Sequence, residues 1–206
     1  MRKIAIIGAG GHGKVVADVA KQVGYQEIVF LDDDIEKELK GYKIIGKCHE
    51  VEKILDQYDI VVAIGNNEIR KQYIKELDLK NAKLPVLKHP KAVIAEDVII
   101  GKGTVVFANV VINSGTVVGK GCILNTACTI DHDNIIEDYV HISPGAHLGG
   151  GVKVRESSWI GIGGIIKNYT TICEKTLVGA GAVVVKDILE SGVYVGVPAK
   201  CMRNKI

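Results

Sequence analysis

A six-residue spacing of aliphatic side chains runs through the second half of the chain. In steps of six, sixteen successive positions from Ile94 to Val184 carry Ile, Leu or Val. The residue two places earlier is usually small or β-branched, with Asn134 as the main polar exception. This period fits neither a helix nor a simple strand, and it indicates a β-helix whose short strands form the faces of a prism. An ordinary β-sandwich with chance spacing is the alternative, which so long a run disfavours.

The repeat also predicts how the core is built. Three hexads make one coil, so residues 18 apart in the sequence should stack on one another. Aliphatic side chains have to fill this core, because 47% of the residues are hydrophobic but only 5% are aromatic. After Val184 the repeat lapses, and Gly192, Gly196 and Pro198 predict a turn and a capping segment. We therefore expect residues 91–206 to form a β-helix with a C-terminal cap.

The first 90 residues have a different pattern, in which predicted strands and helices alternate. Strands are predicted at residues 3–8, 27–33, 59–65 and near 85–87, and helices at residues 13–23, 49–57 and 67–77. Such alternation predicts a small parallel sheet of the Rossmann-like α/β class. The His89-Pro90 break places the end of this α/β domain near residue 90, so that it comprises residues 1–90.

Composition narrows the classes of partner. The formal net charge is only +2, which does not indicate a basic surface for binding nucleic acid. The apolar run at the start is broken by Gly8, too early for a signal peptide, and no other stretch approaches the length of a membrane span. Five cysteines without paired short spacing disfavour a disulfide framework and a structural zinc site. A cytoplasmic protein with small-molecule ligands, neither binding nucleic acid nor inserting into a membrane, is expected.

A glycine-rich loop joins the first predicted strand to the first helix. Gly8, Gly10 and Gly13 spell G-x-G-x-x-G, a pattern that lets a phosphate approach the amides at a helix N-terminus. Asp32 and Asp33 end the second strand, where a carboxylate can accept hydrogen bonds from ribose hydroxyls. About 90 residues leave no room for both halves of a dinucleotide site, so one nucleotide is the better fit. The alternative is that the glycines only allow tight packing and the aspartates only cap a turn.

The third predicted strand adds to the same edge. Gly65 and Asn66 end it, and the carboxyl ends of parallel strands are where open α/β sheets bind ligands. Asn67 could instead be a helix N-cap. These residues favour a ligand site over simple packing.

One histidine of the repeat region has the surroundings of a general base. His132 lies between Asp131 and Asp133 at a hexad corner, and a neighbouring carboxylate fixes the tautomer of an imidazole and stabilises its protonated form. A solvated turn histidine is the alternative. His141 and His147 lie on successive prism faces without a closely spaced ligand, so no metal site is expected.

The motifs together resemble those of a known enzyme family. They are the glycine loop, FLDDD, AIGNNEIR, LNTACTIDHDN, HISPGAHLGG and the terminal GVPAK. The chain resembles the hexapeptide-repeat sugar O- and N-acetyltransferases of bacterial glycan synthesis, including the sialic-acid O-acetyltransferases. It is most similar to the enzymes that N-acetylate UDP-linked 4-amino-4,6-dideoxy sugars on the bacillosamine pathway. The resemblance implies a left-handed β-helix, acetyl-CoA as co-substrate and a homotrimer with acetyl-CoA between neighbouring β-helices.

The resemblance also implies roles for individual residues. His132 matches the catalytic base and Asp133 its acidic partner, although Asp131 could substitute. Around the nucleotide sugar it places a set of glycines and polar residues: Gly10, Gly11, His12, Asp32, Asp33 and Gly65, beside Asn66. Along the acetyl-CoA it places His141, Ile162 and Ala180. The resemblance implies direct transfer without a metal or an acyl-enzyme. Cys122 and Cys128 could be proposed as acyl carriers, but their place in the column of small residues indicates buried packing.

Two alternatives to this function stay open. The His132 region suits an amine or a hydroxyl acceptor, so an O-acetyltransferase acting on sialic acid is the runner-up. A non-enzymatic nucleotide-binding scaffold is the other, and the Asp-His-Asp cluster disfavours it. Outward residues such as Val105, Val111 and Ile135 should make exposed apolar faces, which give a physical reason for a trimer.

Overall fold

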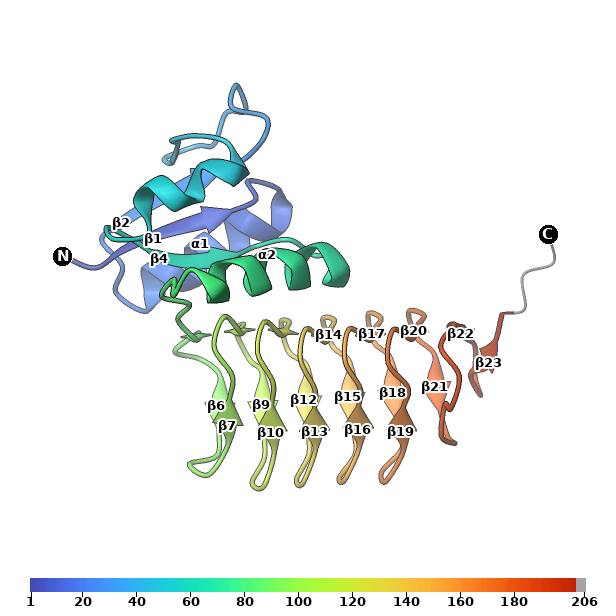
Figure 1. Cartoon of the computed structure of the whole chain (residues 1–206). Coiled ribbons are helices and arrows are strands. Elements are labelled where there is room, and N and C mark those ends of the chain that lie inside the picture. Colours follow the sequence, from blue (N-terminus) through green and yellow to red (C-terminus); the bar gives the residue numbers. More distant parts are fainter. Residues whose placement is uncertain (203–206) are drawn as a thin grey trace.

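The computed structural model describes residues 1–202. Its N-terminal part is a four-stranded parallel sheet in the order β3-β2-β1-β4 (Figure 1). The strands are β1 (Lys3–Ile7), β2 (Glu27–Leu31), β3 (Lys43–Ile44) and β4 (Asp59–Val62). The predicted strands at 3–8, 27–33 and 59–65 are confirmed. Strand β3 was not predicted, because two residues are too short to show alternation.

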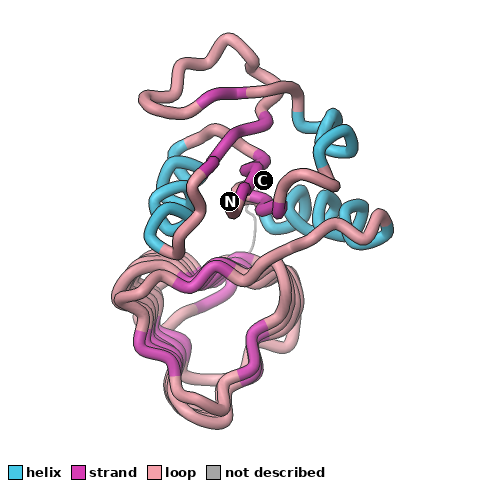
Figure 2. Tube along the Cα trace, turned by 90° about the vertical axis from the view of Figure 1, so that its left-hand side faces the viewer, coloured by secondary structure: helices cyan, strands magenta, loops and turns pink. Residues whose placement is uncertain are grey.

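Helices cover both faces of this sheet (Figure 2). One face packs against α1 (Gly11–Gln22), and the other against η1 (Cys48–Ile54) and α2 (Asn67–Leu79). The side chains of β1 alternate accordingly, since Ile4 and Ile6 lie in the first cluster and Ala5 and Ile7 in the second. The segment predicted as a helix at 49–57 is a 3₁₀-helix, η1.

Short strands, nearly all parallel and two residues long, form the three faces of the β-helix. Sheet I contains β5 (Leu87–Lys88), β8 (Val105–Val106), β11 (Ile123–Leu124), β14 (His141–Ile142), β17 (Trp159–Ile160), β20 (Leu177–Val178), β22 (Val193–Val195) and β23 (Lys200–Cys201). Sheet II contains β6 (Val93–Ile94), β9 (Val111–Ile112), β12 (Thr129–Ile130), β15 (His147–Leu148), β18 (Ile165–Ile166) and β21 (Val183–Val184). Sheet III contains β7 (Ile99–Ile100), β10 (Val117–Val118), β13 (Ile135–Ile136), β16 (Lys153–Val154) and β19 (Thr171–Ile172).

The register confirms the predicted stacking. Ile123 pairs with Val105 in the preceding coil and with His141 in the following one, each 18 residues away. From Val106 to Val184, every aliphatic position of the repeat is no more than 2% exposed. At the C-terminal end, β22 extends sheet I in parallel and β23 pairs with β22 antiparallel, so this segment adds to the end of the solenoid.

One predicted strand belongs to a different sheet from the one expected. The strand near residues 85–87 is β5, which pairs with β8 of sheet I and not with the N-terminal sheet. The first rung of sheet I therefore precedes the His89-Pro90 break. The pattern could not show this, because a two-residue apolar strand carries no signal for its pairing partner.

The N-terminal part lies on sheet I (Figure 1). It covers the outward side chains of the early rungs, so Val105 and Ile123 are 2% and 1% exposed. The expectation that Val105 contributes to an exposed apolar face was therefore wrong, since the α/β part covers it. Asn67 of α2 donates to the carbonyl oxygens of Ser157 and Ser158 in the β-helix.

Arg70 of α2 is the main polar link at this joint. Its guanidinium is 1% exposed and bonds five oxygens, those of Gly121 (2.7 Å), Tyr139 (2.8 Å), Ile64 (3.0 Å), Gly65 (3.1 Å) and the Asn67 side chain (2.7 Å). Burial lowers the pKa of Arg70 to about 10, which leaves it protonated at neutral pH. The carboxyl end of β4 is thus tied to two coils of the β-helix through one side chain.

Candidate active site

The carboxyl edge of the N-terminal sheet presents open backbone. A Cβ atom at Gly13 would lie 2.0 Å from the Gly8 carbonyl oxygen, and Gly8 has a φ of +102°, so these two glycines are required for packing. Gly10 and Gly11 face open space at the start of α1, as does Gly65 beyond β4. The packing interpretation therefore accounts for two of the three glycines of the motif, and helix-terminal amides remain open beside the third, Gly10, and its neighbour Gly11.

Asp32 supports this loop directly. One carboxylate oxygen accepts a hydrogen bond from the Ala9 amide (2.6 Å) and the other accepts one from the Asp34 amide (3.0 Å). Partial burial alone would raise the pKa of Asp32, but these backbone bonds and the nearby Lys37 outweigh it and lower the pKa. The ionised carboxylate therefore holds the glycine loop in shape at the same edge where a ribose is expected.

The other acidic and amide residues of this edge have structural partners too. Asp33 accepts from the Cys48 amide (3.2 Å) and is otherwise exposed. The helix N-cap is Asn66, one residue before the expected Asn67, and its side-chain oxygen accepts from the amides of Glu68 and Ile69. Asn66 thus shapes the β4–α2 turn, which leaves its side-chain NH₂ for a ligand.

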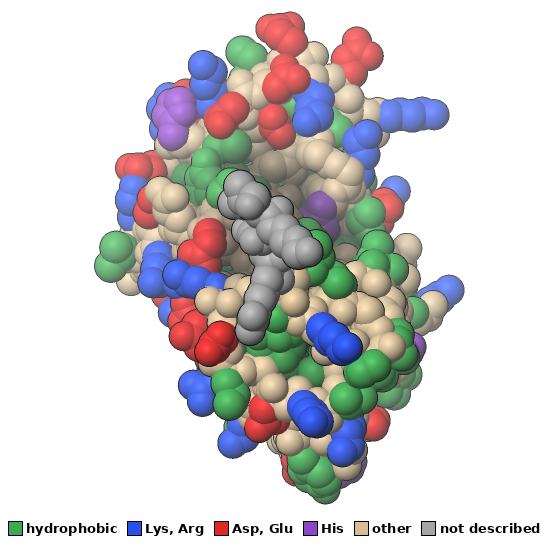
Figure 3. Space-filling model, turned by 90° about the vertical axis from the view of Figure 1, so that its right-hand side faces the viewer, with side chains coloured by type: hydrophobic (Ala, Val, Ile, Leu, Met, Phe, Trp, Pro, Cys, Tyr) green, Lys and Arg blue, Asp and Glu red, His purple; other side chains and the backbone are tan. Residues whose placement is uncertain are grey.

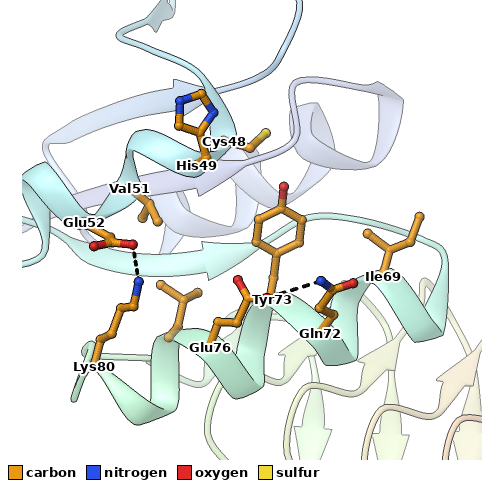
Figure 4. Close-up of a pocket in the computed structure, with 10 residues that line it drawn as sticks. Cys48, His49, Val51, Glu52, Ile69, Gln72, Tyr73, Glu76 and Lys80 are labelled. Atoms are coloured by element: carbon orange, nitrogen blue, oxygen red, sulfur yellow. Dashed lines mark hydrogen bonds and ion pairs between the residues drawn. The ribbon is translucent and has the colours of Figure 1, made fainter.

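A cavity that the sequence did not predict adjoins this edge. It measures about 320 Å³ and lies between η1 and α2 (Figure 4). Tyr73 points from α2 towards Cys48 in this view, and an ion pair between Lys80 and Glu52 closes the other end. Cys48 lines the cavity, and its amide donates to the Asp33 carboxylate, so the cavity lies next to the carboxyl edge of the sheet. No spacing pattern could have shown it, because its walls come from two helices that only the sheet brings together.

Two histidines lie where the α/β part meets sheet I, the half-buried His12 and the buried His141. His12 begins α1 and packs its ring against Phe107 of the β-helix, with centroids 5.6 Å apart. Burial, together with the positive charge of Arg70, lowers the pKa of His12 to about 4 and that of His141 to about 3. Both rings are therefore neutral at physiological pH, and His12 also contributes electrostatically to the low pKa of His141.

The hydrogen bonds of His141 define its tautomer. Asn125 accepts the Thr126 amide through its side-chain oxygen (2.9 Å), so its NH₂ group faces Nε2 of His141 at 3.3 Å. Nε2 is then the acceptor and Nδ1 carries the proton. This N–H is buried without a partner among residues 1–202, and Trp159 stacks on the ring at 4.9 Å. His141 is thus a neutral ring with one buried, unpaired donor, which calls for an explanation beyond packing.

His132 and Asp133 form a pair at an exposed corner. Nδ1 of His132 donates to Oδ2 of Asp133 at 2.7 Å, which leaves Nε2 as a free acceptor. Asp131 is engaged elsewhere, because it accepts from the Asn113 side chain at 3.0 Å. A Cβ atom at Gly150 would lie 2.5 Å from Nε2 of His132, so this glycine makes room for the ring.

The structure does not bring His132 and His141 together within one chain. His132 lies in the turn between β12 and β13, at the corner shared by sheets II and III, whereas His141 lies on sheet I beneath the α/β part (Figure 1). In cross-section the prism is a triangle with the α/β part on one face, and His132 is at the opposite corner (Figure 2). The sequence pattern could not show this separation.

The other two residues placed along acetyl-CoA, besides His141, lie on a third part of the surface. Ile162 and Ala180 are exposed, one coil apart, in the turns between sheets I and II. A groove of about 280 Å³ lies nearby, between the start of α2 and the late rungs of sheet I, with Trp159 and Leu177 in its wall. Figure 3 views the molecule from the end that carries these late rungs.

Neither a metal cluster nor a membrane-spanning helix is found in the described part of the chain. Residues 1–202 contain no group of three or more His, Cys, Asp or Glu side chains placed to hold an ion. Over the same range, no helix is both long and apolar enough to cross a bilayer. Cys122 and Cys128 are fully buried, and burial raises the pKa of each thiol to about 12, which disfavours either as an acyl carrier.

The chain combines a small α/β part that has an open glycine loop with a hexapeptide β-helix that carries a histidine–carboxylate pair. This combination is typical of the β-helix acyltransferases. Residues 3–77 match the family model described as the PglD N-terminal domain. The chain is 30% identical over 175 residues to GDP-perosamine N-acetyltransferase of Escherichia coli O157:H7, covering 81% of this chain and 79% of that protein. It is 34% identical over 113 residues to UDP-N-acetylbacillosamine N-acetyltransferase of Bacillus subtilis (strain 168), covering 52% of each.

A solved structure agrees over almost the whole chain. The acetyltransferase domain of PglB from Neisseria gonorrhoeae FA1090 in complex with acetyl coenzyme A superposes with a TM-score of 0.94 and 46% identity, covering 98% of this chain and 99% of that one. The chain belongs to the hexapeptide-repeat sugar N-acetyltransferases, the family predicted from its motifs. The predicted left-handed β-helix is likewise confirmed.

Proposed function

We propose that this chain transfers the acetyl group of acetyl-CoA to the 4-amino group of a UDP-linked 4-amino-4,6-dideoxy sugar. The observation that carries the proposal is the open backbone at Gly10, Gly11 and Gly65, beside the start of α1, where a diphosphate fits. Residues 1–90 would hold the nucleotide sugar and residues 91–206 the acetyl-CoA. The acetyl-CoA complex of the gonococcal relative and the names of the two curated relatives support these two classes of substrate.

The proposed reaction is a direct transfer in a ternary complex. The amine nitrogen attacks the thioester carbonyl carbon, and the carbonyl electron pair moves to oxygen as the C–N bond forms. Nε2 of His132 takes the proton that the nitrogen loses, while Asp133 orients the ring through Nδ1. The N–H of His141 supports the acetyl carbonyl oxygen. Collapse of the intermediate breaks the C–S bond, and the CoA thiolate is then protonated.

We propose that a homotrimer completes the site. His132 lies at the corner of sheets II and III, away from sheet I, which supports a site whose base is His132 of the partner subunit. Sheet III supports association, because its outward residues Ile99, Val117 and Ile135 are 64%, 42% and 41% exposed. A column of this kind is costly to leave in water, and a neighbouring β-helix would cover it. Acetyl-CoA would then lie near Ile162 and Ala180, between two prisms.

Acceptor preference is tested by supplying acetyl-CoA with a UDP-linked 4-amino sugar, the matching GDP-linked sugar, or free sialic acid. Thiol release is expected to be fastest with the UDP sugar. Its kcat/KM should be at least about tenfold above that of the GDP sugar, because contacts between the protein and the nucleobase contribute to binding of the transition state. Faster turnover of the GDP sugar would replace the nucleotide assignment. Turnover of sialic acid alone would favour the O-acetyltransferase alternative, and turnover of none would favour a scaffold.

The acceptor loop has its own test. Asp32→Ala removes the acceptor of the Ala9 amide, so the glycine loop should loosen. Losing such a charged partner costs about 1–3 kcal/mol, which predicts a roughly tenfold or larger rise in the Kd of the nucleotide sugar. Isothermal titration with each ligand measures it, and the Kd of acetyl-CoA should stay constant. Asp34→Ala is the matched control, because this residue contributes its amide and not its side chain. Unchanged nucleotide-sugar binding in Asp32→Ala would contradict the assignment.

A further inference from the structure

The inward column of small residues contains one amide side chain. The column, two residues before each aliphatic position, is Val98, Thr104, Val110, Thr116, Cys122, Cys128, Asn134, Val140, Ala146, Val152, Ser158, Gly164, Thr170, Thr176 and Ala182. Asn134 is fully buried, and it comes directly after the turn that carries His132 and Asp133. The larger amide at this place needs a physical reason.

Three of the five hydroxyl groups in the column make one recurring bond. The hydroxyls of Thr104, Thr116 and Ser158 each donate to the carbonyl oxygen fifteen residues ahead, at 2.8, 2.9 and 2.7 Å. Asn134 makes the equivalent bond to Gly149 at 3.0 Å. A threonine would therefore satisfy the general requirement of the coil at this position.

Asn134 makes two further bonds that a threonine could not. Its NH₂ group also donates to the carbonyl oxygens of Asp131 (2.8 Å) and His132 (3.2 Å). These carbonyls lie on the two peptide groups that flank the Cα atom of His132. The buried amide thereby restrains the backbone from which the His132 ring projects.

This arrangement carries a stability cost. The side-chain oxygen of Asn134 is buried and has no hydrogen-bond partner among the described residues 1–202. An unsatisfied buried acceptor is unfavourable, and no bond of the coil requires it. An amide that leaves one buried acceptor unpaired, at the turn bearing the proposed base, points to a functional reason.

We propose that Asn134 is a positioning residue for catalysis. It fixes the peptide groups on both sides of His132, so that the ring bonds Asp133 and presents Nε2 in one direction. The proposal rests on the proposed function, because it requires His132 to be the base. It predicts that stability and turnover respond differently to the same substitution, which a residue that only stabilises the coil would not produce.

Asn134→Thr tests this. We expect kcat to fall about tenfold, since small misplacement of a catalytic group is costly, while the KM values of both substrates change less than about twofold. The melting temperature should stay the same or rise. Cys128→Thr, one hexad earlier in the same column, is the matched control and should keep wild-type kcat. If Asn134→Thr does not fold, the same measurements are made on Asn134→Cys, because cysteine occurs elsewhere in the column.

The outcomes separate this proposal from the proposed function. Wild-type kcat in the folded variant, or a loss of kcat that follows a lowered melting temperature, would overturn the positioning role. Combining Asn134→Thr with His132→Ala should give no further loss beyond His132→Ala alone, because the positioned group is gone. A further multiplicative loss would also overturn it. If His132→Ala alone keeps full turnover, the base assignment fails instead, and the positioning role fails with it.

Discussion

Replacing His132 by alanine is expected to lower kcat about a hundredfold or more, the usual effect of removing a general base. Nε2 is the free nitrogen of the ring, because Nδ1 is bonded to Asp133 at 2.7 Å. Without it, the attacking amine has to lose its proton to water. The KM of acetyl-CoA should change little, since the residues proposed to contact it lie elsewhere. Steady-state thiol release with the UDP-linked 4-amino sugar measures both constants.

Two controls accompany this variant. His147→Ala removes another exposed histidine of the same coil region, which bonds Thr129 at 2.8 Å, and it should keep wild-type kcat. Trimers assembled from His132→Ala and Asp32→Ala chains should regain part of the activity, because some sites then combine an intact acceptor loop with an intact base. Near-wild-type turnover by His132→Ala at neutral pH would remove the base assignment.

The β-helix could be predicted from the sequence because its signal is periodic. Each inward position from Val106 to Val184 is buried, and the 18-residue stacking follows from the six-residue spacing. The parallel sheet was predicted for a similar reason, since strands and helices alternate in the first part. Where an element is only two residues long, as for β3 and β5, there is no period to detect, and its pairing could not be predicted.

The candidate site could be predicted only in parts. Glycine and aspartate motifs at strand ends identified the acceptor edge, but they could not distinguish the packing role of Gly8 and Gly13 from the open backbone at Gly10. The pairing of His132 with Asp133 in place of Asp131 depends on a contact of Asp131 with the preceding coil. The separation of His132 from His141 depends on which prism face each occupies, and this is a property of the assembled coils.

Arg70 had no sequence signal, because its main partners are backbone carbonyls. We expect Arg70→Met to lower the free energy of unfolding by about 3–5 kcal/mol, as when one member of a buried polar network is lost. The carbonyls of Gly121 and Tyr139 would stay buried without their donor, and each such group costs about 1–3 kcal/mol. Urea unfolding measured at constant protein concentration gives the change.

The loss of the Arg70 side chain should also affect substrate binding at the carboxyl edge of the N-terminal sheet. Arg70 also holds the carbonyls of Ile64 and Gly65, so Arg70→Met should raise the KM of the nucleotide sugar more than that of acetyl-CoA. Lys71→Met is the matched control, because this neighbouring cation pairs with Glu156 near the surface and such pairs contribute about 0–1 kcal/mol. Arg70→Lys should lie between the two, since an ammonium group has fewer donors than a guanidinium. Equal losses in Arg70→Met and Lys71→Met would show that the buried network adds nothing beyond an ordinary surface cation.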